Sequence, residues 1–128
     1  MDSECLWGEP MGSGTYLLKN VPFFIDNVSW GDCVSAVERE GVLYFVRVVA
    51  RGGHSTFRIA AKLGRFHPPV LERLDKLVRE HKCLIEGVTD RLVALSVPPS
   101  ADLEDVGTIL EECEARGLWD FDVARLYQ

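Results

Sequence analysis

The spacing of apolar residues changes about midway along this 128-residue chain. Through residue 61, short runs of β-branched and aromatic residues are separated by glycine-containing turns, a pattern typical of strands. Between Val70 and His81, apolar residues instead recur every three or four positions, which predicts an amphipathic helix over residues 69–82. A chain with both patterns places strands and helices in one fold, so the sequence predicts the α+β class.

The first half, residues 1–54, predicts strands alone. Gly12-Ser13-Gly14 marks a hairpin turn, and Arg39-Glu40-Gly41 marks another. Short strands separated by regular turns indicate a small β-barrel-like unit or a strongly bent antiparallel sheet. The expected strands are Leu6–Glu9, Thr15–Leu18, Val21–Ile25, Val28–Val34 and Val42–Val49.

The second half, residues 55–128, predicts a β-α-β-β-α order with a last short strand or packed tail at Trp119–Asp122. Asp102 precedes an apolar periodic run and is expected to cap the second helix. This order is that of a ferredoxin-like, split β-α-β unit. Because only Gly52-Gly53-His54 separates the halves, we expect one shared core and a single domain over residues 1–128. The expected strands are Ser55–Ala61, Cys83–Gly87 and Arg91–Val97.

Composition and charge exclude several classes of function. The net charge of −6 argues against nucleic-acid binding, which depends on neutralising phosphates. The acidic N-terminus does not resemble a signal peptide, and no apolar run approaches the ~20 residues that span a bilayer, so we expect a cytoplasmic protein without membrane association. The charge is uneven: residues 47–82 carry nine bases and three acids, whereas residues 101–128 carry eight acids and two bases. These segments either neutralise each other in the fold or present an acidic face to a basic partner.

The four cysteines, at positions 5, 33, 83 and 113, are too widely spaced for a typical metal site. Each lies in an apolar or periodic stretch, so they are expected to act as small buried hydrophobic residues. The chain also lacks the phosphate-binding, hydrolase and dinucleotide motifs. We therefore expect no metal, no cofactor and no catalytic residue.

The segment Arg51–Thr56 concentrates polar chemistry around two glycines. Glycine N–H groups and a guanidinium can hold an anion, which makes Arg51, Gly53, His54 and Ser55 candidate ligand-binding residues. Asp32 could orient His54 as a general base, or it could accept from backbone donors at a corner beside Gly31. Direct activation of Ser55 by His54 is not expected, because neighbouring residues in a strand point to opposite faces. The alternative is a glycine turn with hydroxyls bonded to local backbone.

The acidic C-terminal part offers a candidate partner surface. Acids on the second helix can steer a basic protein, and the following aromatic residues can supply contact area. The alternative is an ordinary solvated helix face. The candidate residues are Glu104, Glu111, Glu112, Glu114, Trp119 and Phe121.

Two functions from different classes fit these features. The first, which we favour, is a non-enzymatic protein-binding module, such as an immunity- or antitoxin-like inhibitor or an adaptor for a basic partner protein. The second is a small enzyme or anionic-metabolite binder that uses the Arg51–Thr56 turn. Either could act as a monomer or homodimer.

Several stretches, in order along nearly the whole chain, resemble one bacterial family, catalogued as domain of unknown function number 4265. The resemblance implies a compact, stand-alone cytoplasmic protein, and it implies no activity or catalytic residue. The stretches are Leu6–Pro10, Val21–Phe24, Val28–Asp32, Gly53–Thr56, Val97–Leu103 and Gly117–Phe121.

Overall fold

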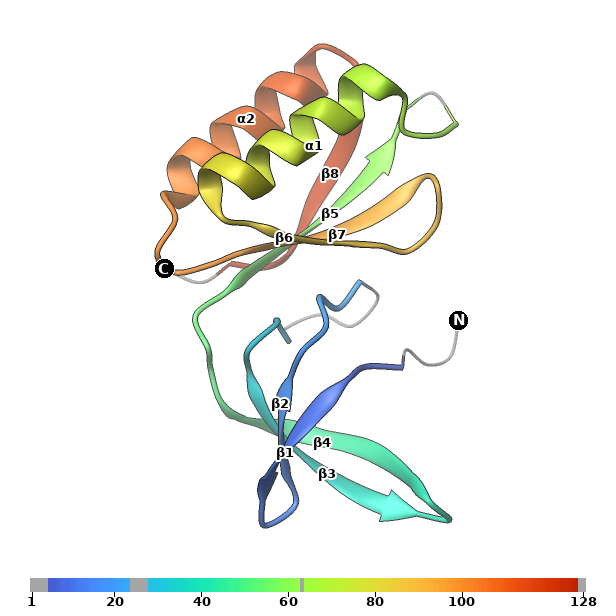
Figure 1. Ribbon diagram of the computed structural model, residues 1–128, viewed down its shortest axis with the longest axis vertical. Helices are drawn as coiled ribbons and strands as arrows, with labels where there is room; N and C mark the ends of the chain where they lie inside the picture. The colour runs from blue at the N-terminus through green and yellow to red at the C-terminus, as the bar shows by residue number, and fades with distance from the viewer. Residues whose placement is uncertain (1–4, 24–27, 63, 127–128) are drawn as a thin grey trace.

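The computed structural model describes residues 5–23, 28–62 and 64–126. These residues form two four-stranded antiparallel sheets and two helices, which confirms the α+β class (Figure 1). The first sheet has the order β1-β2-β3-β4, and the second has the order β6-β7-β5-β8. The elements are β1 Gly8–Gly12, β2 Thr15–Leu18, β3 Cys33–Arg39, β4 Val42–Ala50, β5 Ser55–Ala61, α1 Pro68–His81, β6 Leu84–Gly87, β7 Leu92–Val97, α2 Leu103–Ala115 and β8 Trp119–Arg125.

The first sheet is open. In the part of the chain that the structure describes, its edge strands β1 and β4 pair only with β2 and β3, so the barrel-like alternative is wrong. Four short strands are too few to close around a filled interior. The turns fall where glycine predicted them, and Glu40 and Gly41 both have positive φ, 52° and 81°, which makes the β3–β4 turn type I′.

Three expected strands of the first half differ from the structure. The first covers Gly8–Gly12, whereas Leu6–Glu9 was expected. Val21, Pro22 and Phe23 form no strand, and residues 24–27 lie outside the described ranges. Pro22 cannot donate to a ladder, and Val21 and Phe23 are instead buried against Ala94 of the second sheet. The strand expected at 28–34 begins only at Cys33, because the preceding residues form a turn that carries the junction described below.

The second half follows its sequence pattern closely. Pro68 and Pro69 occupy the first turn of α1, where their missing N–H groups cost nothing, and the helix ends at Lys82 with a positive φ of 58°. Asp102 caps α2 by accepting from the backbone N–H groups of Glu104 and Asp105, at 3.0 and 3.2 Å. Figure 1 shows both helices side by side on one face of the second sheet. Neither helix is long and apolar enough to cross a membrane, within the residues described.

The buried apolar residues of the described chain fall into three clusters. The largest lies between the helices and the second sheet and includes Trp119 and Leu110. A second cluster lies in the first half and contains Leu18, Val28 and Val34. The third, around Phe23, joins the halves, because its members come from the β2–β3 connection and from β7.

Candidate functional site

An open groove of about 740 Å³ lies beside the N-terminal part of α2. Its floor and walls come from β5, the end of β7, the following Pro98-Pro99 segment, α2 and β8. Its volume falls within the range typical of ligand and peptide-anchor pockets, about 300–1,000 Å³. The apolar lining residues are Phe57, Val97, Leu103, Phe121, Val123 and Leu126.

The apolar side of the groove offers a large water-exposed contact area. Val123 and Leu126 are each 47% exposed, which is high for residues that line a concave surface. Phe121 packs at an angle against Phe57, with ring centroids 6.2 Å apart. Aromatic and aliphatic side chains gathered around a cavity are what partner hot spots require.

The opposite side of the groove carries acids from α2. Glu104, Gly107 and Glu111 share one helix face because they are three and four residues apart. Because Gly107 has no side chain, the space between the two glutamates is open: a Cβ at this position would meet nothing within 4 Å. Asp102 also borders the groove, but its carboxylate is already engaged in capping α2. The groove therefore combines an apolar wall with two exposed carboxylates.

The structure brings three of the expected partner-contact residues together at this groove: Glu104, Glu111 and Phe121. Glu112 borders a different small hollow, near Arg73 of α1. Glu114 accepts a hydrogen bond from the Phe121 backbone N–H at 3.2 Å, which fixes the start of β8 against α2.

Trp119 differs from its expected place on a contact surface. Its side chain is fully buried, and its Nε1–H donates to the Leu110 carbonyl at 3.1 Å. A buried indole with its one donor satisfied contributes packing in the core. In this structure Trp119 therefore packs in the core and cannot touch a partner.

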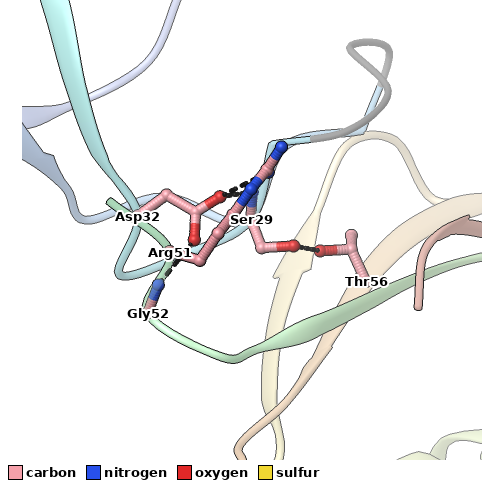
Figure 2. A network of polar contacts seen from close by, with 5 residues as sticks. All are labelled: Ser29, Asp32, Arg51, Gly52 and Thr56. Atoms are coloured by element: carbon pink, nitrogen blue, oxygen red, sulfur yellow. Dashed lines mark hydrogen bonds and ion pairs between the residues drawn. The ribbon is translucent and has the colours of Figure 1, made fainter. Parts of the chain in front are cut away.

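The second candidate, the Arg51–Thr56 segment, lies at the junction between the two halves (Figure 2). The Asp32 carboxylate, only 1% exposed, accepts from the backbone N–H groups of Ser29 at 3.0 Å and Gly52 at 2.9 Å. The same carboxylate pairs with the Arg51 guanidinium at 3.2 Å. Beside it, the Ser29 and Thr56 hydroxyls are 2.7 Å apart and link the β2–β3 connection to β5. The network joins the first half to the second sheet.

Gly52 is required at this junction for steric reasons. A Cβ placed on Gly52 would lie 2.4 Å from the carbonyl oxygen of Gly31 and 2.7 Å from its carbonyl carbon. Both atoms belong to backbone, which cannot rotate away as a flexible side chain can. Gly31 itself has a φ of 84°, in the left-handed region that favours glycine.

His54 also belongs to the junction. Its Nδ1 lies 2.9 Å from the Ser96 hydroxyl on β7, and its ring lies 4.9 Å from that of Trp30. Burial lowers the pKa of His54 from its ordinary value of 6.5, and the nearby Asp32 carboxylate partly opposes this shift. Ser55 is buried on β5, and it lines the groove together with Gly53. The expected anion-binding set is thus divided between the junction and the groove.

No group of three or more His, Cys, Asp or Glu side chains suited to a metal ion occurs among the residues described. Two of the cysteines, Cys83 and Cys113, are buried as expected, whereas Cys5 is exposed and Cys33 is half-buried. Burial raises the pKa of both buried thiols, that of Cys83 to about 12. Such thiols are poor ligands and poor nucleophiles.

Apart from Phe121, sequence reasoning missed the residues of the apolar wall. Val97 and Val123 belong to strands that are far apart in the chain, and they come together only because both β7 and β8 pair with β5. A signal for this strand was present in the sequence: apolar residues continue past Asp122 as Val123, Ala124 and Leu126. This continuation indicates a final strand longer than the one expected.

Comparison with known proteins identifies the family of the chain. The model of a domain of unknown function, DUF4265, matches residues 4–121. The chain belongs to this family. The resemblance drawn from the sequence is thereby confirmed.

A solved structure with the same fold is a crystal structure of a hypothetical protein from Neisseria gonorrhoeae. The TM-score is 0.81 at 24% sequence identity, over 98% of this chain and 84% of that one. No curated protein matches the chain. The DUF4265 family and this neighbour establish the fold and leave the activity to be inferred from the site.

Proposed function

We propose that this DUF4265 protein is a non-enzymatic binding module that captures a basic segment of a partner protein in the groove between α2 and β8. The observation that carries the proposal is the pairing of an apolar wall, which includes Val123 and Phe121, with the carboxylates of Glu104 and Glu111 across the groove. An adaptor, or an immunity- or antitoxin-like inhibitor of a basic protein, would use such a surface.

The chemistry of the groove favours a segment with apolar residues flanked by lysine or arginine. Apolar side chains entering the groove would bury surface beside Phe121 and Leu126, which provides affinity. Basic side chains would then reach Glu104 and Glu111 at the rim, where carboxylates steer association and fix the orientation of the segment. The acidic C-terminal region supplies the same sign of charge around the site.

The alternative, a small enzyme or anionic-metabolite site at the Arg51–Thr56 turn, has less support. The Arg51 guanidinium pairs with Asp32, and the Gly52 N–H donates to the same carboxylate, so two of the expected anion donors serve the junction. An anion would have to displace a buried carboxylate that satisfies the backbone of both loops.

Two further assignments belong to this proposal. We assign the second half to the ferredoxin-like class, on the support of its β-α-β-β-α-β element order and its β6-β7-β5-β8 strand order. We also propose a cytoplasmic location, on the support of the four free cysteines, which are usual in a reducing compartment.

The proposal is tested by affinity capture from the native host with matched charge variants. The tagged wild type is compared with Glu104→Lys/Glu111→Lys in the groove and with Glu72→Lys/Glu80→Lys on α1, which changes the net charge equally. A third variant, Val123→Asp, disturbs the apolar wall and leaves the helix acids intact, and Val78→Asp on α1 is its control.

We expect one stoichiometric basic protein with the wild type and both α1 controls. Both groove variants should lose at least tenfold in affinity, because each removes an interaction worth more than about 1.4 kcal/mol. Equal capture by the groove variants, or a wild type without a stoichiometric basic partner, would contradict the proposal.

A further inference from the structure

The first part of the edge strand β4 is apolar and open on both of its faces. The whole strand, Val42 to Ala50, contains one charged residue, Arg47. Five consecutive residues, Val42–Val46, are between 46% and 52% exposed. Since consecutive side chains of a strand point to opposite faces, this run leaves both faces of the strand in water. Within the described residues β4 pairs only with β3, so its outer edge is open as well.

Natural edge strands are protected against pairing with another chain by brevity, lysine, proline or bulges. β4 is nine residues long and contains neither lysine nor proline. Register shifts relative to β3 leave Val46 and Val49 without a direct partner, which disturbs its second part. The first part, Val42–Phe45, pairs one to one with β3 and is therefore regular enough to accept another strand.

We propose that a second copy of this chain covers the edge, with the two β4 strands pairing antiparallel across a two-fold axis. An edge strand can pair antiparallel with its own copy, because a two-fold axis brings the same surface together from both sides. The paired edges would join the two first sheets into one eight-stranded sheet. This surface lies in the first sheet, whereas the groove belongs to the second half, so the two proposals stand independently (Figure 1).

The hairpin geometry sets the register of this pairing. In a two-residue type I′ hairpin the flanking residues, here Arg39 and Val42, form a hydrogen-bonded pair. Alternation along the ladder then directs the peptide groups of Leu43 and Phe45 toward the open edge. Exchange of bonds between Leu43 and the partner's Phe45 places Tyr44 on the two-fold axis, opposite its own copy.

This register also brings opposite charges together. A residue that follows Tyr44 in one copy lies opposite the residue that precedes Tyr44 by the same number of positions in the other copy. Arg47 of one copy therefore lies opposite Gly41 of the other, next to Glu40. The contact occurs twice because of the two-fold axis. Opposite charges on facing strands favour pairing, whereas like charges oppose it.

The contact at this edge consists of backbone hydrogen bonds and of the adjoining sides of the β4 side chains. Six residues of β4 are large apolar side chains that are about half exposed. Pairing at the edge covers only the sides of these residues that face the partner strand and leaves both faces of the joined sheet in water. The Arg47–Glu40 contacts add to the backbone bonds at each end.

The test introduces a charge of either sign at Tyr44, on the two-fold axis. Size-exclusion chromatography with light scattering then measures the mass of the full chain in solution. The wild type is expected at twice the 14.4 kDa mass of one chain. Tyr44→Lys and Tyr44→Glu should each be monomeric, because each places like charges opposite one another. An equimolar mixture of the two variants should recover the dimer. Leu71→Lys, an equally exposed apolar site on α1, should remain dimeric.

Circular dichroism confirms that each variant is folded, and recovery in the mixture gives a second check. A monomeric wild type overturns the proposal, and so does a dimer that persists in Tyr44→Lys. Monomeric single variants without recovery on mixing overturn the register centred on Tyr44.

Discussion

Gly52→Ala should destabilise the protein strongly, although it adds one methyl group to an exposed loop. The added Cβ would lie 2.4 Å from the Gly31 carbonyl oxygen, whereas real Cβ atoms essentially never come closer than 3.0 Å to such an atom. The Gly31 and Gly52 backbones would have to separate, and the Gly52 N–H would then leave Asp32, which it bonds at 2.9 Å. Overpacking costs about 1–3 kcal/mol, and a weakened buried hydrogen bond adds about 1 kcal/mol.

We therefore expect Gly52→Ala to lower the free energy of unfolding by about 2–4 kcal/mol, measured by urea denaturation followed by circular dichroism. Gly107→Ala is the matched control, because a Cβ there meets nothing within 4 Å and the residue lies inside α2. That variant should gain about 0.5–1 kcal/mol from improved helix propensity. A Gly52→Ala variant within about 0.5 kcal/mol of wild type would refute the close contact between the two loops.

Three other predictions concern single side chains. Asp32→Ala should lower the free energy of unfolding by about 3 kcal/mol in urea denaturation, because the backbone N–H groups that donate to the buried carboxylate lose their acceptor. Asp32→Asn should lower it by less, because the amide keeps one acceptor oxygen. The pKa of His54 is lowered in the folded state, so the unfolded chain binds more protons than the folded protein as the pH falls through 6.5. Below that pH the free energy of unfolding of the wild type should therefore fall relative to that of His54→Gln. Above about pH 7.5 the two proteins should show the same pH dependence. An equal pH dependence throughout would contradict the burial of the His54 imidazole. Cys5 should react with a thiol reagent at pH 8 at least a hundredfold faster than Cys83, whose pKa of about 12 and burial suppress the thiolate, and mass spectrometry identifies the labelled site.

Local signals predicted the second half well. The strand Ser55–Ala61 has the predicted limits, because its alternation ends before the helix-starting Pro68-Pro69. The Asp102 cap also follows from residues that are neighbours in the chain. Such features depend on contacts within a few residues, and these are what a single sequence records most directly.

Features that depend on distant contacts could not be predicted in the same way. Val21–Phe23 has the composition of a strand, yet it packs on Ala94, which is more than 70 residues away. Trp119 looked available for contact because its hydrogen-bond acceptor, the Leu110 carbonyl, faces it only after the chain reverses beyond α2. The apolar residues of β4 would ordinarily indicate burial, and their exposure follows from the place of β4 at the sheet edge.

Asp32 shows how the structure decides between two interpretations of one residue. The sequence offered Asp32 as an orienting group for His54 or as an acceptor for backbone donors at a corner, and it offered Arg51 as an anion-binding residue; the structure brings the two together as an ion pair at 3.2 Å. Asp32 does satisfy backbone N–H groups, those of Ser29 and Gly52, but its bond to Gly52 depends on the approach of two loops that no local pattern reports.

The most direct test of the groove proposal is site-specific photocrosslinking in the native host. A photoreactive phenylalanine analogue replaces Val123 in the groove or, as control, Val78 on the exposed face of α1. We predict that the Val123 position crosslinks to one protein, through a segment that contains apolar residues next to lysine or arginine, and that the Val78 position does not. Absence of a crosslink at Val123, equal crosslinking at Val78, or attachment to an acidic segment would contradict the proposed function.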